Sequence, residues 1–371
     1  MSNQVANCVS AHCFSPDGSQ VAVSPNTEEV WIFDVNGAPG DCSGWKRTSV
    51  LSNHMQAVSG LDWSVNNQLV SVSHDRQAYV WSFVEGQWLE SLVELRAGKA
   101  ATGVRWAPDG TKFVVSTSAR EAIVCFWSHD NACWVSRKIV SPKATVMDAC
   151  WHPCGHVVLV GGIDRRCFVA AAHISGFDEQ AGEFAGKSLE GVKVGERLLE
   201  VGHSHAWAVG TAFSPTGKEV AVCYQDGTVA FQEEGGEAVT VRHRGLPFCK
   251  IMFLSPDTAV AVGFDYEPVA FVKASGKWQI KERGSGGKGG AGGYGQQSTP
   301  AEFTSFKDAK SMFQAKERTG GESSGASKST KHDNVITQLR PFETTNGRVT
   351  KFTTSGLDGR VVLWPTSELG V

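Results

Sequence analysis

The chain has 371 residues, of which 41% are hydrophobic and 20% charged, and its formal net charge is -3 at pH 7. This apolar content is enough for a large core. The small negative charge excludes the basic field that nucleic-acid binding requires. No segment approaches the roughly 20 apolar residues of a membrane helix. We therefore expect one soluble domain with no nucleic-acid partner and no membrane span.

The N-terminal residues and the cysteines both favour the cytoplasm. Met1 to Ser10 is polar and has neither the basic start nor the apolar run of a signal peptide. Ten cysteines are spread over the chain, many of them alternating with apolar residues. This pattern is typical of reduced core thiols rather than of a disulfide framework.

A short phrase recurs along the chain: an aromatic residue, a small or polar residue, a proline and usually a glycine, followed by a β-branched run. The aromatic anchors are Phe14, Trp63, Trp106, Trp151, Phe213 and Phe253. They stand 40 to 62 residues apart, which is the period of four-stranded propeller blades. A seventh unit, Val335 to Trp364, has Leu339-Arg340-Pro341 in the place of the anchor.

Each unit contains short β-branched runs between turn formers, in chain order Val21–Val23, Leu69–Val72, Phe113–Val115, Val157–Val160 and Val220–Val222. Helical periodicity is confined to one late insertion. The sequence therefore predicts an all-β fold, a seven-bladed propeller spanning residues 1–371. Because only Pro365 to Val371 follows Trp364, we expect the residues before Phe14 to supply the outer strand of the seventh blade, which would close the ring and protect its edges.

An aspartate follows the anchor by 12 or 13 residues in four units, and the seventh unit has its own: the five are Asp75, Asp164, Asp226, Asp265 and Asp358. The chain resembles WD-type propellers, in which this aspartate joins a histidine, a Ser or Thr and a Trp in a buried hydrogen-bond network. The second unit has the full set, His54, Ser71 or Ser73, Asp75 and Trp81; the seventh has His332, Thr354 or Ser355, Asp358 and Trp364. Their periodic placement favours a structural role over a catalytic one.

Three stretches could suggest an active site, and each lacks a required part. Cys150, His152, Cys154 and His156 alternate on one strand, so their side chains point the same way and cannot easily surround a zinc ion. Residues 202–205 contain Ser204 between two histidines, but no nucleophile elbow or companion acid. The glycine-rich residues 284–295 lack the Gly-Lys-Ser/Thr of a phosphate loop. We expect no catalytic residue, no metal and no cofactor.

An insertion over residues 284–331, between the sixth and seventh units, has glycine-rich ends that are typical of flexible tethers. Between them Thr299, Pro300 and Glu302 form an N-terminal capping pattern, which predicts a helix over about residues 300–318. Its apolar face carries Phe303, Phe306, Ala309 and Phe313, interrupted by Lys310, within about 120° of one another. An isolated helix of this length is marginal in water, so it either folds back on the propeller or docks in a partner's apolar groove.

Together these features resemble the WD-repeat subunit family of the actin-related protein 2/3 complex. The shared features are seven WD-type blades, a long segment after the fourth, and a glycine-rich insertion with a helix before the seventh. Phrases similar to that family lie at residues 30–33, 60–63, 74–81, 104–108, 145–153, 195–200 and 355–359.

The resemblance implies a non-catalytic scaffold subunit of an assembly that nucleates branched actin filaments in the cytoskeleton. Its partners would be the other subunits, actin filaments and nucleation-promoting factors. The inserted helix would contact actin of the mother filament through Phe303, Phe306, Ala309, Lys310, Met312 and Phe313. Two alternatives stay open: a WD40 adaptor of another complex, such as a substrate receptor of a ubiquitin ligase, and a propeller enzyme, such as a calcium-dependent lactonase.

Overall fold

The computed structural model describes residues 4–37, 40–140, 142–180, 182–202, 205–281 and 330–371. The chain divides into one unit of residues 1–281 and 331–371 and a second of residues 282–330. Nearly all of the predicted insertion, including the predicted helix at 300–318, lies outside the described residues.

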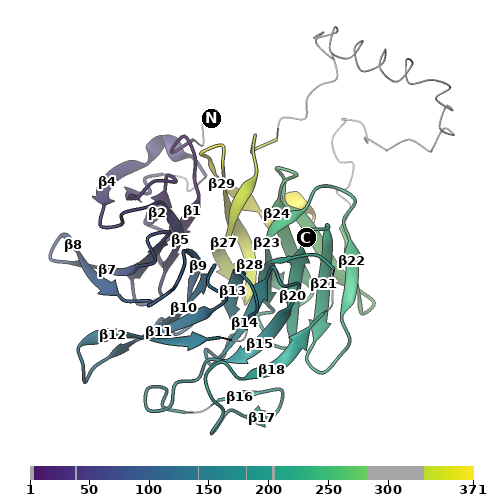
Figure 1. The fold of residues 1–371 in the computed structure, drawn as a ribbon. Coiled ribbons are helices and arrows are strands. Elements are labelled where there is room, and N and C mark those ends of the chain that lie inside the picture. Colours follow the sequence, from purple (N-terminus) through teal and green to yellow (C-terminus); the bar gives the residue numbers. More distant parts are fainter. Residues whose placement is uncertain (1–3, 38–39, 141, 181, 203–204, 282–329) are drawn as a thin grey trace, which may run out of the picture. The chain divides into compact units, whose positions relative to one another are not determined.

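The first unit consists of seven antiparallel sheets, the blades, arranged around a common centre (Figure 1). Blade one contains β1 (Ala11–Phe14), β2 (Gln20–Ser24), β3 (Val30–Asp34) and β4 (Lys46–Leu51), with a short 3-10 turn, η1 (Cys42–Gly44), before β4. Blade two contains β5 (Val58–Trp63), β6 (Gln68–Ser73), β7 (Ala78–Val84) and β8 (Gln87–Val93). Blade three contains β9 (Ala101–Trp106), β10 (Lys112–Thr117), β11 (Ala122–Ser128) and β12 (Cys133–Ile139).

Blade four contains β13 (Val146–Trp151), β14 (Val157–Gly162), β15 (Cys167–Ala171) and β18 (Arg197–Val201); a hairpin of β16 (Glu183–Phe184) and β17 (Lys187–Ser188) lies in the excursion before β18. Blade five contains β19 (Ala208–Phe213), β20 (Glu219–Tyr224), β21 (Thr228–Glu233) and β22 (Val239–Arg242). Blade six contains β23 (Phe248–Ser255), β24 (Thr258–Gly263), β25 (Val269–Ala274) and β26 (Lys277–Ile280). Blade seven contains β27 (Ile336–Thr345), β28 (Arg348–Gly356) and β29 (Val361–Pro365), and the 3-10 helix η2 (Thr366–Leu369) follows it.

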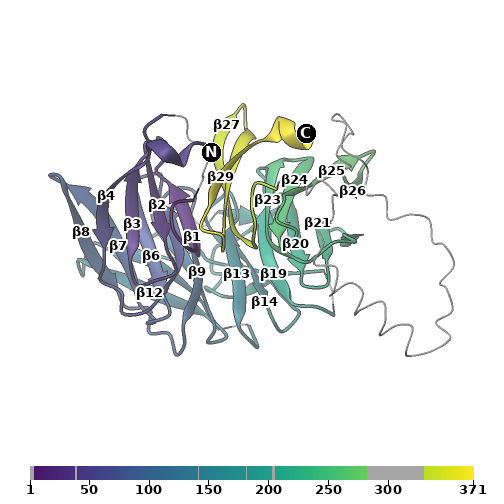
Figure 2. The same ribbon diagram turned by 90° about the horizontal axis from the view of Figure 1, so that it is seen from above.

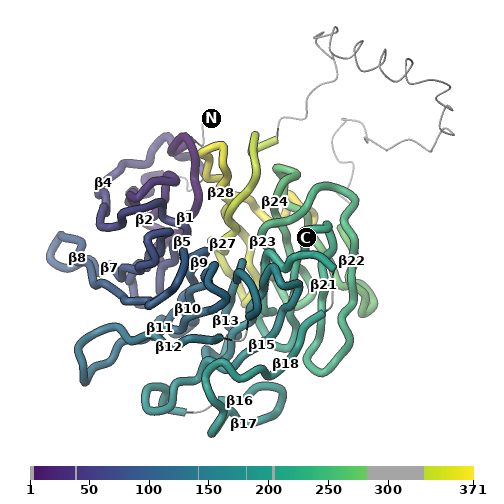
Figure 3. The backbone as a smooth tube through the Cα atoms, viewed as in Figure 1, coloured from purple at the N-terminus to yellow at the C-terminus, as the bar shows by residue number. Residues whose placement is uncertain are grey.

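The ring is closed, because the first strand of each blade contacts the first strand of the next all the way round, and β27 contacts β1. The backbone trace in Figure 3 shows the last blade, in yellow, lying between the purple first blade and the green sixth blade. Figure 2 shows the first strands β1 and β27 close to each other where the ring closes. The predicted all-β, seven-bladed WD40-type propeller is therefore confirmed.

The core consists of apolar layers between neighbouring blades. Between blades three and four, for example, Val114 and Phe126 pack with Val158 and Phe168, and all four are buried. The second strands β14, β20 and β24 are buried along their whole length. The outer strands, by contrast, expose most of their residues, as β4 and β22 do. Outer strands therefore carry little hydrophobic pattern.

The outer strand that we expect the N-terminal residues to supply to blade seven stays a prediction. Among the described residues, Gln4 forms an isolated antiparallel bridge to Arg360, directly before β29. The amides of Val5 and Ala6 donate to the carbonyl oxygen of Gly359, at 2.8 and 3.3 Å. The amide of Val9 donates to the carbonyl of Gly356 at 3.2 Å, and Val9 itself is fully buried. Residues 4–9 thus bind the turn between β28 and β29, and residues 1–3, which would continue the pairing along β29, lie outside the described residues.

In the part of the chain that the structure describes, no helix combines the length and the hydropathy needed to cross a bilayer.

Candidate functional site

The predicted network of blade two is held together by one hydroxyl. His54 lies in the loop before β5; its Nδ1 lies 2.9 Å from Asp75 Oδ2, and its Nε2 lies 2.8 Å from Ser71 Oγ. Trp81 Nε1 donates to the same Ser71 oxygen at 2.9 Å. A carboxylate only accepts, so the neutral His54 ring donates from Nδ1 and accepts the Ser71 proton at Nε2. Every polar group is then satisfied, and Ser71, not Ser73, is the member of the network.

Blade seven repeats this arrangement residue for residue. His332 Nδ1 lies 2.9 Å from Asp358 Oδ2, and its Nε2 lies 2.7 Å from Thr354 Oγ1. Trp364 Nε1 donates to Thr354 Oγ1 at 2.8 Å. The geometry selects Thr354 over Ser355, which serves a different contact.

Ser355 belongs to a contact between the last blade and the first. His12 of β1 is fully buried; its Nδ1 lies 2.8 Å from Ser355 Oγ and its Nε2 lies 2.9 Å from Thr353 Oγ1. Burial, followed by the nearby guanidinium of Arg340, lowers the pKa of His12 well below its usual range. His12 is therefore neutral, and it links β1 to β28 across the point of ring closure. Sequence reasoning missed it because it lies at an ordinary inward position of a strand.

The other three predicted aspartates have fewer partners. Asp265 Oδ2 lies 2.7 Å from His243 Nε2 and also accepts the amide proton of Leu246. Asp164 accepts from the amides of Lys143 and Arg166. Asp226 accepts from the amide and the hydroxyl of Thr228. Each of these aspartates stabilises a turn through the amide, hydroxyl or imidazole groups of nearby residues. This arrangement indicates a structural role and not a cluster of catalytic carboxylates.

Inner strands from five blades carry charged residues toward the centre of the ring. Arg340 of β27 donates from Nη1 to Asp62 Oδ1 of β5 at 2.7 Å, and its Nη2 donates to the carbonyl of Leu61. Lys250 of β23 donates to Asp148 of β13 at 2.5 Å. Burial opposes ionisation of Asp148, but Lys250, Arg105 and hydrogen bonds together lower its pKa. A sequence signal was available: Asp62 and Arg105 each stand one position before an aromatic anchor, and Arg340 lies in the segment that takes the anchor's place in the seventh unit.

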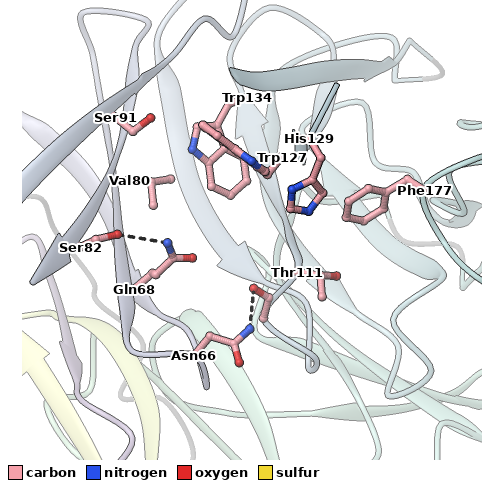
Figure 4. A pocket seen from close by; sticks show the side chains of 11 residues that line it. Asn66, Gln68, Val80, Ser82, Ser91, Thr111, Trp127, His129, Trp134 and Phe177 are labelled. Atoms are coloured by element: carbon pink, nitrogen blue, oxygen red, sulfur yellow. Dashed lines mark hydrogen bonds between the residues drawn. The ribbon is translucent and has the colours of Figure 1, made fainter. Parts of the chain in front are cut away.

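A pocket of about 470 Å³ opens between blades two and three (Figure 4). Trp127, Trp134, His129 and Phe177 form its aromatic side. Its polar side is tied by a hydrogen bond from Gln68 Nε2 to Ser82 Oγ at 3.1 Å. The residues that line it include no carboxylate, lysine, arginine or cysteine. This composition suits an apolar side chain better than a reacting substrate.

The loops before the first strands and the turns before the third strands lie on one face of the propeller, because strand direction alternates within every blade. On this loop face the exposed large apolar residues among those that the structure describes are Met55, Val140, Trp207, Leu246, Phe264, Tyr266 and Leu357. Met55 is 85% exposed, although the neighbouring His54 is buried. The first unit is interrupted between β26 and β27, and its residues on either side of the interruption, Lys281 and Lys331, belong to the same face.

The predicted partner-binding residues of the insertion, Phe303, Phe306, Ala309, Lys310, Met312 and Phe313, all lie outside the described residues. Their role stays a prediction from the sequence.

Comparison with known proteins gives one family match and a set of full-length relatives. The family model "WD domain, G-beta repeat" matches residues 45–82, which cover the outer strand of blade one and most of blade two. "Actin-related protein 2/3 complex subunit 1B" of Arabidopsis thaliana is 33% identical over 99% of this chain and 96% of the relative. "Actin-related protein 2/3 complex subunit 1" of Schizosaccharomyces pombe is 29% identical over 95% of both chains. The Saccharomyces cerevisiae protein of that name is 28% identical over 95% and 94%.

Proposed function

Because the chain belongs to the family of actin-related protein 2/3 complex subunit 1, we propose that it is a non-catalytic scaffold subunit of that complex and supports nucleation of branched actin filaments. The observation that carries this proposal is the 33% identity to a relative along nearly the whole of both chains. The likeness extends over 99% of this chain, a span that includes all seven blades and the insertion, and is therefore not confined to one repeat.

The described chemistry supports a scaffold rather than an enzyme. The carboxylates of the His54 and His332 networks are held by histidines and backbone amides, and Asp62 and Asp148 at the centre are each paired with a cation. A calcium-dependent lactonase needs carboxylates free to bind the metal at the central channel, and these two already neutralise Arg340 and Lys250. The exposed apolar residues of the loop face suit contacts with sibling subunits.

The partners follow from the family: the other subunits, actin filaments and nucleation-promoting factors, in the cytoplasmic actin networks of the cytoskeleton. Affinity purification of the tagged full-length chain followed by mass spectrometry tests this. We expect the two actin-related proteins and the remaining subunits in comparable amounts. Recovery of ubiquitin-ligase components without actin-related proteins would instead support the WD40-adaptor alternative.

The inserted helix is proposed to contact actin of the mother filament through its apolar face. Three phenylalanines on one face of a predicted helix favour its burial against another apolar surface. The glycine-rich ends would act as flexible linkers that let the helix extend to a partner. Changing Phe303, Phe306 and Phe313 together to Ser should leave the complex assembled but reduce branching several-fold in a pyrene-actin assay.

The matched control changes Thr304, Asp308 and Ser311 to Ala, which alters the opposite side of the same predicted helix. This control should branch like the parent complex. Normal branching by the phenylalanine variant would mean that the helix covers the propeller and does not bind actin.

A further inference from the structure

Three side chains of blade four converge at the start of its long excursion. His156 directly precedes β14, His173 follows β15, and Asp178 lies five residues further on. Asp178 Oδ2 is 3.3 Å from His173 Nδ1 and 3.6 Å from His156 Nδ1. All three candidate ligand atoms lie within 4.8 Å of one another. Topology alone brings them together, since no sequence motif has this spacing.

The two imidazoles have an unusual hydrogen-bonding state. Nδ1 of His156 and Nδ1 of His173 are both buried, and neither has a hydrogen-bond partner. His173 as a whole is only 8% exposed. Burying a polar atom without a hydrogen-bond partner is destabilising, so two such atoms facing one carboxylate require an explanation.

A metal ion provides that explanation. Zinc binds imidazole nitrogen and carboxylate oxygen at about 2.0–2.2 Å, so the corners of a tetrahedral site lie roughly 3.3–3.5 Å apart. The distances of 3.3 and 3.6 Å from Asp178 Oδ2 are close to this spacing. We propose that His156, His173 and Asp178 bind one divalent transition-metal ion, of which zinc suits the donor set best, with water at the fourth position.

Asp178 is already oriented by other groups. Lys112 of blade three is fully buried, and its Nζ donates to both carboxylate oxygens at 2.6 Å. The amide of Ile174 donates to Oδ2 at 2.7 Å. In the metal-bound protein Lys112 retains Oδ1 while Oδ2 binds the ion, an arrangement typical of ligating carboxylates. Because its ammonium group also repels the ion, Lys112 lowers the affinity of the site for the metal.

This site is not the Cys and His set considered from the sequence. His152 Nδ1 accepts the amide proton of Cys154 at 3.0 Å, and its ring packs against Phe184 and Phe213. Only His156 is common to both sets. The bound ion would tie the excursion to β14 and β15, where Phe177 also packs on Phe126 of blade three, with ring centroids 4.8 Å apart.

The test uses the full-length chain, purified without a polyhistidine tag and treated with a chelator. Titration with Co²⁺, followed by the visible absorption of the tetrahedral ion, should give one ion per chain, and Zn²⁺ should displace it. His173→Gln and Asp178→Asn should each weaken binding at least about tenfold. His74→Gln is the control, since His74 is an exposed histidine of blade two.

Lys112→Met should bind the ion several-fold more tightly, because the competing cation is gone. The unfolding midpoint of each variant shows that it is folded; if His173→Gln does not fold, His156→Gln carries the same test, because its side chain is 20% exposed. Binding well below one ion per chain, or binding unchanged in the His173 and Asp178 variants, would overturn the proposal.

Discussion

Single hydroxyl groups hold the complete networks of blades two and seven together. Ser71 accepts a hydrogen bond from Trp81 and donates one to His54. Thr354 makes the same two hydrogen bonds with Trp364 and His332. Both hydroxyl-bearing residues are fully buried. Loss of either hydroxyl therefore leaves two buried polar groups without a partner, which costs more than the loss of one exposed hydrogen bond.

We expect Ser71→Ala to lower the free energy of unfolding by about 2–4 kcal/mol, because each orphaned group costs roughly 1–3 kcal/mol. Urea unfolding followed by tryptophan fluorescence measures the change. Ser82→Ala is the control, since the half-buried Ser82 accepts only from Gln68 on the same blade. Equal losses in the two variants would show that the network has no special contribution.

Buried neutral histidines should make the protein sensitive to mild acid. Burial is the largest cause that lowers the pKa of both His12 and His54, although Asp75 opposes the shift of His54. Their folded-state pKa values lie below the unfolded value of about 6.5. As pH falls below about 6.5 the unfolded chain takes up protons that the folded chain does not, so stability is lost; it is fully present above that pH.

The expected slope is at most about 1.4 kcal/mol per pH unit for each such histidine. Urea unfolding at pH 7.5, 6.5 and 5.5 measures it, and His12→Asn should give a shallower slope while His74→Gln should not. The lowered pKa values of Asp75 and Asp358 act only below about pH 4 and do not enter this window. Constant stability from pH 7.5 to 5.5 would refute the assignment of neutral histidines.

At the scale of elements, the N-terminal segment and the turn between β28 and β29 depend on each other. Gly359 adopts a φ of +74°, which glycine tolerates best, and its carbonyl receives the amides of Val5 and Ala6. A Cβ at Gly359 would overlap the carbonyl of Ala6. Close approach of two backbones, and not only the turn itself, requires glycine here.

Gly359→Ala should therefore destabilise the protein more than the same change at Gly347. Gly347 has a φ of +72° in the hairpin of the same blade, and an added Cβ there meets no atom within 4 Å. We expect Gly347→Ala to cost about 1 kcal/mol for the left-handed conformation, and Gly359→Ala to lower the melting temperature by several degrees more. Differential scanning calorimetry of the two variants decides; equal melting temperatures would mean that the N-terminal segment does not hold the ring.

At the scale of the molecule, the charged centre joins blades that are not neighbours. The pair between Arg340 and Asp62 links blade seven to blade two and passes over blade one. Asp62 Oδ2 also accepts the amide of Trp106 in blade three at 2.6 Å. One carboxylate thus connects three blades, which supplies a tie that nearest-neighbour packing cannot.

Arg340→Met should lower the free energy of unfolding by about 3–5 kcal/mol, because it leaves the Asp62 carboxylate buried without its cation. Chemical denaturation gives this value. Lys351→Met on β28 removes a solvent-exposed pair with Glu343 and should leave the unfolding curve unchanged. An Arg340 variant as stable as the parent chain would show that water replaces the guanidinium without cost.

Much of the architecture could be predicted because it repeats. The aromatic anchors, the β-branched runs and the aspartates recur at the blade period, and each copy reinforces the others. The outer strands could not be located from the sequence, because they are exposed and carry no alternating pattern, as in β4 and β22. The contacts of Gln4 with Arg360 and of Val9 with Gly356 join residues far apart in the sequence, so no local pattern predicts them.

By itself the sequence determined the number of blades, the family, and the histidine, aspartate and tryptophan of the two complete networks, since each depends on local residue pattern or on spacing along the chain. The tertiary structure decided which hydroxyl serves each network, the pairing of Arg340 with Asp62, and the meeting of His156, His173 and Asp178. These contacts join residues from different strands or blades whose separation in sequence carries no period. They depend on strand register and ring closure, which only the folded chain defines.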